Sequence, residues 1–162
     1  MESKHIYREV QAFATWWLGL LLALFIGFLI YYAIVKNGGN ITFGIGMFIG
    51  VGVVLLIFLT RLHSRVDTEG IHIRFFPFVW KEKSWRWEDI EKVYVRKYSV
   101  WEYGGWGYRF NGAGIAYNTK GIYGIQLVLK RKGARILIGT QNPKEVEEVL
   151  KQYQLINKDN EA

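Results

Sequence analysis

Two long runs without a charged residue dominate the first third of this 162-residue chain. One covers the 26 residues between Glu9 and Lys36, and the other covers the 24 residues between Lys36 and Arg61. A bilayer core about 30 Å thick is crossed by about 20 apolar helical residues, and both runs exceed that length. We therefore predict two transmembrane helices, over about residues 12–35 and 41–60, and exclude a purely soluble globule.

The five residues between the two runs, 36–40, are rich in Gly and Asn, which predicts a short turn and a tight antiparallel helical hairpin. A cleaved signal peptide is the alternative for the first run. The apolar core of a signal peptide is about 7 to 15 residues long, which is shorter than this run. The sequence therefore favours a retained membrane anchor.

Positive charges flank the outer ends of the two predicted helices. Lys4 and Arg8 precede the first helix, Arg61 and Arg65 follow the second, and the turn carries only Lys36. Because Lys and Arg are enriched in cytoplasmic loops, we expect a multi-pass protein of the plasma membrane with both termini in the cytoplasm. The lack of cysteine agrees with a reducing compartment.

Glycines of the second predicted helix offer a close-packing face. Gly46 and Gly50 are four residues apart, so they share one side of a helix and let another backbone approach. We expect this face to pack against the first helix of the same chain. Homodimerisation through the same face is the alternative.

The pattern changes after the second run to short alternating segments separated by turn residues, which is typical of β-strands. The predicted strands are residues 65–67, 71–76, 83–87, 92–98, 122–130 and 134–139. The first two and the last two form predicted hairpins, the second with a basic tip at residues 131–133, and a single turn is predicted at residues 87–90. Asn142 is an N-cap residue and Pro143 suits a first helical position, so a helix begins there. Its predicted apolar face consists of Val146, Val149, Leu150 and Tyr153.

Four segments together resemble a bacterial pleckstrin-homology-like (PH-like) domain: residues 66–71, 87–93, 104–109 followed by Tyr117, and 136–143. The resemblance implies a β-rich PH-like barrel over residues 62–153, closed by one C-terminal amphipathic helix. It also implies a domain that binds or scaffolds rather than catalyses, placed after two transmembrane segments. The expected organisation is a cytoplasmic segment and transmembrane hairpin at 1–61, the PH-like domain at 62–153 and a polar tail at 154–162.

The segment from Val100 to Tyr117 is unusually rich in aromatic residues and glycine, with Arg109 as its only cation and Glu102 as its only anion. Large rings supply amphipathic surface, and glycine permits tight turns. Three uses remain open for this segment. It fills the open end of the barrel core, contacts lipid headgroups with Arg109 on a phosphate, or lines a groove for a ligand or peptide.

Basic residues are the second candidate surface. Residues 61–142 hold 15 Lys and Arg against 7 Asp and Glu, and an anionic leaflet attracts such residues by about 1 kcal/mol each. The enrichment of Lys and Arg on the cytoplasmic side of membrane proteins explains part of this excess of basic residues. Two basic clusters stand out, one of Lys81, Lys83 and Arg86 and one of Lys130, Arg131, Lys132 and Arg135. The candidate ligand- or membrane-contact residues are Trp101, Tyr103, Trp106, Tyr108, Arg109, Lys130, Arg131 and Lys132.

No catalytic motif stands out in the sequence. Cysteine is absent, and His5, His63 and His72 are not at the spacing of metal ligands. We therefore expect no enzyme, no metal and no cofactor. The expected function is a binding or scaffolding domain at the inner membrane surface that engages anionic lipid headgroups or protein partners. The alternative is an accessory subunit or stabiliser of a membrane complex, and the membrane tether disfavours nucleic acid.

Overall fold

The computed structural model describes residues 7–14, 16–35, 41–112, 114–131 and 133–159, with side-chain surroundings for all of these except 16, 41–43 and 154–159. The chain forms two compact units. One runs from Ala12 to Thr60, and the other joins the residues up to Gln11 to those from Arg61 onward. The second unit is called the β domain below.

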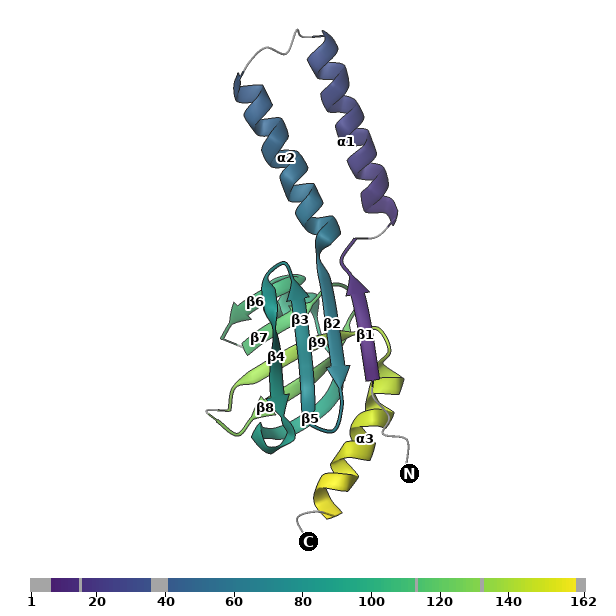
Figure 1. Ribbon diagram of the computed structural model, residues 1–162, viewed down its shortest axis with the longest axis vertical. Helices are drawn as coiled ribbons and strands as arrows, with labels where there is room; N and C mark the ends of the chain where they lie inside the picture. Colours follow the sequence, from purple (N-terminus) through teal and green to yellow (C-terminus); the bar gives the residue numbers. More distant parts are fainter. Residues whose placement is uncertain (1–6, 15, 36–40, 113, 132, 160–162) are drawn as a thin grey trace. The chain divides into compact units, whose positions relative to one another are not determined.

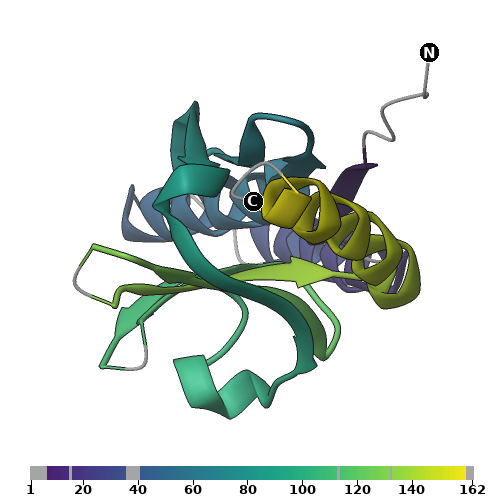
Figure 2. The same cartoon turned by 90° about the horizontal axis from the view of Figure 1, so that it is seen from below.

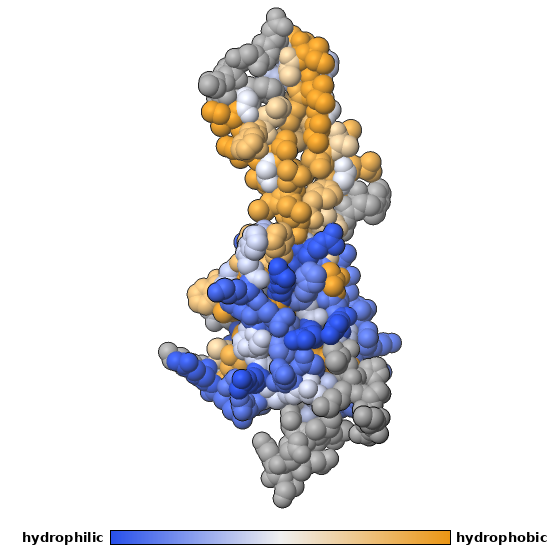
Figure 3. All heavy atoms as spheres, viewed as in Figure 1, coloured by the Kyte–Doolittle hydropathy of each residue, from blue (hydrophilic) through white to orange (hydrophobic). Residues whose placement is uncertain are grey.

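Helices α1 (Trp16–Val35) and α2 (Ile41–Leu59) make up the first unit. Most of their described side chains are apolar and exposed, and these residues form the hydrophobic surface in Figure 3. Within the described residues, Trp17–Val35 is long and apolar enough to cross a membrane, judged by length and composition, whereas the apolar stretch Gly44–Leu59 is shorter. These properties favour association with a membrane.

The β domain contains two sheets (Figure 1). The four-stranded sheet has the order β1-β2-β3-β4, with β1 at Tyr7–Ala12, β2 at Arg61–Val66, β3 at Gly70–Phe76 and β4 at Val79–Arg86. The five-stranded sheet has the order β5-β8-β9-β7-β6, with β5 at Ile90–Lys97, β6 at Gly107–Asn111, β7 at Gly114–Asn118, β8 at Tyr123–Leu129 and β9 at Arg135–Thr140. Strands β4 and β6 are therefore outer strands of their sheets.

Both hairpins predicted from alternation are confirmed. Strands β2 and β3 pair antiparallel, as do β8 and β9. The single turn predicted at residues 87–90 is the short 3-10 helix η1 (Trp87–Asp89). Strand β7 instead pairs in parallel with β9, a non-local pairing that alternation within one segment does not reveal.

Strand β1 was not predicted, and it moves a domain boundary. The sequence grouped residues 1–61 with the helical hairpin, but residues up to Gln11 belong to the β domain. Strand β1 lies beside β2 and runs in the opposite direction (Figure 1). Glu9 and Gln11 are among its inward, buried residues, so the strand lacks the apolar alternation that identifies a half-buried strand. The helices are thus inserted between two neighbouring strands of one sheet.

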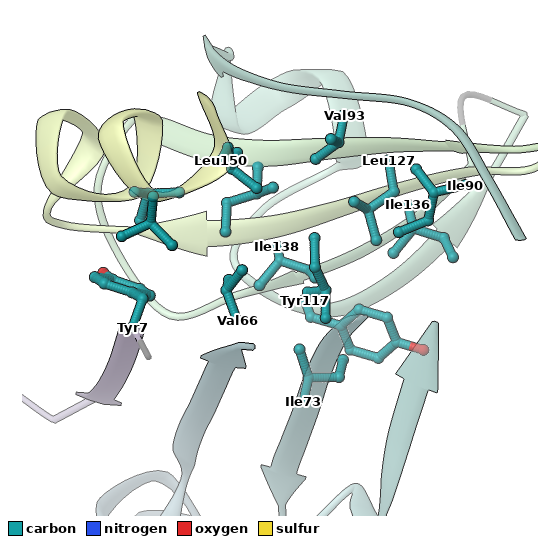
Figure 4. Close-up of a cluster of buried hydrophobic side chains, with 14 of the residues drawn as sticks. Tyr7, Val66, Ile73, Ile90, Val93, Tyr117, Leu127, Ile136, Ile138 and Leu150 are labelled. Atoms are coloured by element: carbon teal, nitrogen blue, oxygen red, sulfur yellow. The ribbon is translucent and has the colours of Figure 1, made fainter. Parts of the chain in front are cut away.

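The core of the β domain lies between its two sheets (Figure 4). Val66 and Ile73 from the four-stranded sheet meet Leu127 and Ile138 from the other, and all four are nearly inaccessible to solvent. This apolar contact holds the two sheets together.

Helix α3 (Pro143–Asp159) packs against β5 and β8 and closes one side of this core (Figure 2). Its predicted apolar face is confirmed, since Val146, Val149, Leu150 and Tyr153 are buried. The helical backbone continues to Asp159, so most of the tail predicted at 154–162 is helical.

Candidate functional site

The aromatic and glycine-rich segment contains no predicted strand, but it forms a 3-10 helix, η2 (Val100–Tyr103), followed by the hairpin of β6 and β7. Tyr108 of β6 pairs with Tyr117 of β7 in this hairpin. Its glycines and scattered rings mask the two-residue alternation of a strand. The segment therefore contributes a regular edge to the five-stranded sheet.

Tyr103 belongs to the interior of the β domain. Only 3% of its surface is exposed, and it joins Tyr98, Ala116 and Leu137 in a small second core. Of the three uses left open by the sequence, core filling is the one that this residue performs. Tyr103 is therefore not a contact residue for a ligand or membrane.

A salt bridge fixes η2 against β5. Arg96 donates hydrogen bonds from Nη1 and Nη2 to the two carboxylate oxygens of Glu102, at 3.0 and 2.6 Å, and from Nε to Gln126 at 3.0 Å. The bonds from Arg96 lower the pKa of Glu102. Bidentate pairs of this kind are geometrically specific, so the only acid of the segment is paired with Arg96 at the surface of the domain.

Three other predicted residues lie on the surface of the same segment. Trp101 is 86% exposed. Trp106 donates a long hydrogen bond from Nε1 to the Gly121 carbonyl at 3.4 Å, and Arg109 donates from Nε to the Trp106 carbonyl at 3.2 Å. Arg109 is exposed, so its charge is accessible to an anion in solution.

Tyr108 forms part of a stacked cluster around a lysine. Its ring stacks on Tyr117 at a centroid distance of 5.2 Å. Lys83 of β4 donates from Nζ to the hydroxyl of Tyr117 at 3.0 Å, and Nζ lies 5.5 and 5.9 Å from the Tyr117 and Tyr108 ring centres. The bond to Tyr117 raises the pKa of Lys83, while burial raises the pKa of Tyr117. Lys83 is therefore a fixed cation held by two aromatic rings.

Lys83 and Tyr117 of this cluster line a groove of about 560 Å³, and Tyr108 is not among its lining residues. Lys83 and Trp85 come from β4, Phe110 and Tyr117 come from the β6–β7 hairpin, and Arg135 comes from β9. The described residues that line the groove include no Asp or Glu. We call it the β4–β7 groove.

The predicted basic tip of the β8–β9 hairpin borders the same groove. Gly133 and Ala134 line it, and Lys130 and Arg131 are exposed beside them in the chain. Lys132 lies outside the described residues. The fold thus places the aromatic hairpin and the basic tip, which are distant in sequence, around one groove.

Two residues that line the groove were not among the contact residues predicted from the sequence. Lys83 was noted only as part of a basic cluster, and Trp85 was not singled out. Their strand pairing with Ile73 and Ile71 places both on the core-facing side of β4. Side chains two residues apart share a face of a strand. Aligning the predicted strand 83–87 with the predicted strand 71–76 would therefore have placed Lys83 and Trp85 on the core-facing side.

The predicted glycine face of α2 divides into two environments. A Cβ on Gly50 would lie 3.3 Å from the ring of Phe25 in α1, whereas a Cβ on Gly46 meets nothing within 4 Å. Within the described helices, the contact with α1 thus uses Gly50 and leaves Gly46 open.

A polar cluster lies on the opposite face of the four-stranded sheet. His72 contacts Ser84 through Nδ1 at 2.9 Å and Asp67 through Nε2 at 3.1 Å. Burial opposes ionisation of Asp67, but backbone N–H groups of Glu69 and Gly70 and the bond with His72 lower its pKa overall. Asp67 therefore stabilises the β2–β3 turn as a carboxylate. No group of metal-binding residues occurs among the described side chains, and the absence of enzymatic activity stays a prediction.

The β4–β7 groove therefore combines a fixed ammonium group with aromatic walls. Such a site suits an anion attached to an apolar or planar body, since cations bind the charge and rings pack on the rest. Neither protein-family models nor curated proteins nor solved structures gave a match to this chain.

Proposed function

We propose that this protein is a membrane-anchored binding protein whose β domain holds an anionic lipid headgroup in the β4–β7 groove. The observation that carries the proposal is the Lys83 ammonium group, held against aromatic rings in a groove whose described lining residues include no acid. A hydrogen bond to a charged group contributes about 1.5 to 3 kcal/mol. Phosphatidylcholine also carries a phosphate, but its choline cation finds no acid among the described lining residues, so the groove favours a headgroup with a net negative charge.

The anchor in this proposal is a transmembrane hairpin of α1 and α2 with both termini in the cytoplasm. The apolar length of Trp17–Val35 supports the first span, and the uncharged run of 24 residues before Arg61 supports the second. Lys and Arg at the outer ends support the orientation. A tethered domain meets its lipid at high effective concentration, so a weak site suffices.

The β domain in this proposal is PH-like. Two sheets that enclose one core, with a single C-terminal helix closing one side, support this assignment. The long insertion between β5 and β8 is the β6–β7 hairpin, which supplies one wall of the groove. Because a fold alone does not define an activity, the ligand is argued from the groove itself.

Lipid retention by the full-length protein tests the proposal. The protein, in detergent with equal amounts of phosphatidylglycerol and phosphatidylcholine, is analysed by native mass spectrometry. We expect phosphatidylglycerol adducts to exceed phosphatidylcholine adducts several-fold. The double variant Lys83→Gln, Arg135→Gln should lose this preference, because it removes both basic residues from the described lining of the groove.

A matched double variant, Lys92→Gln with Lys144→Gln, controls for net charge. Both lysines are exposed and neither lines the groove, so we expect this variant to retain the preference. Thermal unfolding of each variant verifies that the β domain is intact. Equal retention of the two lipids by the unmodified protein, or an equal loss in both double variants, would contradict headgroup binding in the groove.

The second function expected from the sequence, an accessory subunit of a membrane complex, stays a prediction. Its proposed contacts were the glycine face and the aromatic segment. Gly50 already contacts Phe25 of its own chain, whereas Trp101 and Phe110 are strongly exposed. A partner would therefore be sought at the aromatic residues first.

A further inference from the structure

A second group of exposed aromatic residues lies at the turn between β3 and β4. Phe78 is 51% exposed and Trp80 is 65% exposed. The Phe76 and Trp80 rings meet edge to face at 5.0 Å, and Phe78 stacks at 5.6 Å on Phe75, which is fully buried. We call Phe76, Phe78 and Trp80 the aromatic turn. The Phe78 ring is therefore held against the core, and the Phe76 and Trp80 rings support each other.

Strand register places the aromatic turn at one particular end of the four-stranded sheet. Phe76 pairs with Arg61, the first residue of β2. Strand β1 runs opposite to β2 and ends at the same end of the sheet (Figure 1). Only Thr60 separates Arg61 from the last residue of α2. The aromatic turn therefore lies at the end where the chain leaves the β domain for the apolar helices and returns from them.

The charges near the aromatic turn are positive. From Gly70 to Lys81 the chain contains no Asp or Glu, and Arg74 and Lys81 flank the three aromatic residues. Arg61, across from Phe76, is exposed. Trp rings concentrate at the headgroup level of bilayers, and Phe rings enter the boundary between headgroups and acyl chains. Cations there are attracted to anionic lipid. Rings flanked by cations have the composition of a membrane-interface anchor.

We propose that the aromatic turn inserts into the headgroup region of the bilayer and fixes the orientation of the β domain at the membrane surface. This inference rests on the proposed transmembrane hairpin. It adds a lipid contact that is separate from the β4–β7 groove, since none of the three residues lines that groove. In this proposal the aromatic turn contacts the bilayer, and the groove selects the headgroup.

Site-directed fluorescence tests this inference, and the lack of cysteine in the chain makes single labelling specific. Full-length Phe78→Cys is labelled with an environment-sensitive nitrobenzoxadiazole dye and reconstituted in nanodiscs that contain a headgroup spin-labelled lipid. We expect a blue-shifted emission and quenching several-fold stronger than in the control. The control is Thr68→Cys, exposed in the β2–β3 turn at the opposite end of the sheet.

The outcomes separate this inference from the proposed function. Equal quenching at residues 78 and 68 in protein that is incorporated into nanodiscs overturns the insertion of the aromatic turn and leaves the membrane anchor standing. Failure of the protein to incorporate into nanodiscs would overturn the anchor, and the inserted turn with it. Detergent-solubilised samples verify that the dye at residue 78 has no blue shift from protein contacts alone.

Discussion

A chain that begins at Arg61 should fail to fold, although it contains all the segments from β2 to α3. Strand β1 is part of the β domain, and its Tyr7, Glu9 and Gln11 are buried. Removing β1 exposes one edge of the four-stranded sheet and part of the core between the sheets. We expect the truncated chain to lack a cooperative thermal transition.

Hydrogen bonds from β1 explain why its removal is expected to prevent folding. Glu9 accepts from the Thr140 hydroxyl through Oε2 at 2.8 Å and from the Gln141 backbone N–H through Oε1 at 2.9 Å. Gln11 donates from Nε2 to the Gly139 carbonyl at 2.6 Å and accepts from Thr119 at 2.9 Å. An unpaired buried group costs about 1 to 3 kcal/mol. Several such losses approach the total stability of a domain, about 5 to 15 kcal/mol.

A matched chain tests whether β1, rather than helices α1 and α2, is what the β domain needs to fold. The Phe13 N–H donates to the Thr60 carbonyl at 3.1 Å, the spacing of the two ends of a two-residue β-turn. A chain in which residues 14–59 are replaced by Asn-Gly, a strong hairpin turn, should therefore fold as a soluble protein. Circular dichroism and thermal unfolding compare the two chains. A cooperative transition in the chain that begins at Arg61, with a similar midpoint, would contradict the role of β1.

Gly114→Ala should be the most damaging small substitution in the β6–β7 hairpin. Gly114 begins β7 with a φ of +127°, which disfavours any residue with a side chain. A Cβ there would lie 2.3 Å from the backbone carbonyl oxygen of Arg135. The strands must separate to admit it, and we expect a loss of about 3 kcal/mol or more in unfolding free energy.

Gly112→Ala is the matched control for this substitution. Its Cβ would meet nothing within 4 Å, so we expect its unfolding free energy to remain within about 0.5 kcal/mol of the unmodified protein. Urea unfolding of the two full-length variants in detergent gives the comparison. Equal stability of the two variants would refute the close approach of β7 and β9.

The sequence predicted those parts of the fold whose signals are local. Alternation and turn residues identified the β2–β3 and β8–β9 hairpins, and the N-cap at Asn142 located the start of α3. Strand β1 was not predicted, because Glu9 and Gln11 face inward and are stabilised by partners more than 100 residues away. No local pattern records such partners.

The candidate site was predicted in pieces. The aromatic segment and the basic tip were both identified, but not the groove between them, because its walls come from β4, the β6–β7 hairpin and the β8–β9 hairpin. The parallel pairing of β7 with β9 brings these walls together. Tyr103 has the same residue type as Tyr108 and lies five residues away, yet one is buried and the other exposed. Only the folded structure distinguishes the buried tyrosine from the exposed one.

Cysteine accessibility in intact cells tests the central claim, that a membrane hairpin carries the β domain on the cytoplasmic side. Two full-length single-cysteine variants are compared with a membrane-impermeant maleimide: Gly38→Cys, between the two helices, and Thr68→Cys, in the β domain. The account predicts labelling of Gly38→Cys in intact cells and labelling of Thr68→Cys only after lysis. Labelling of Thr68→Cys in intact cells, or recovery of the protein in the soluble fraction, would contradict it.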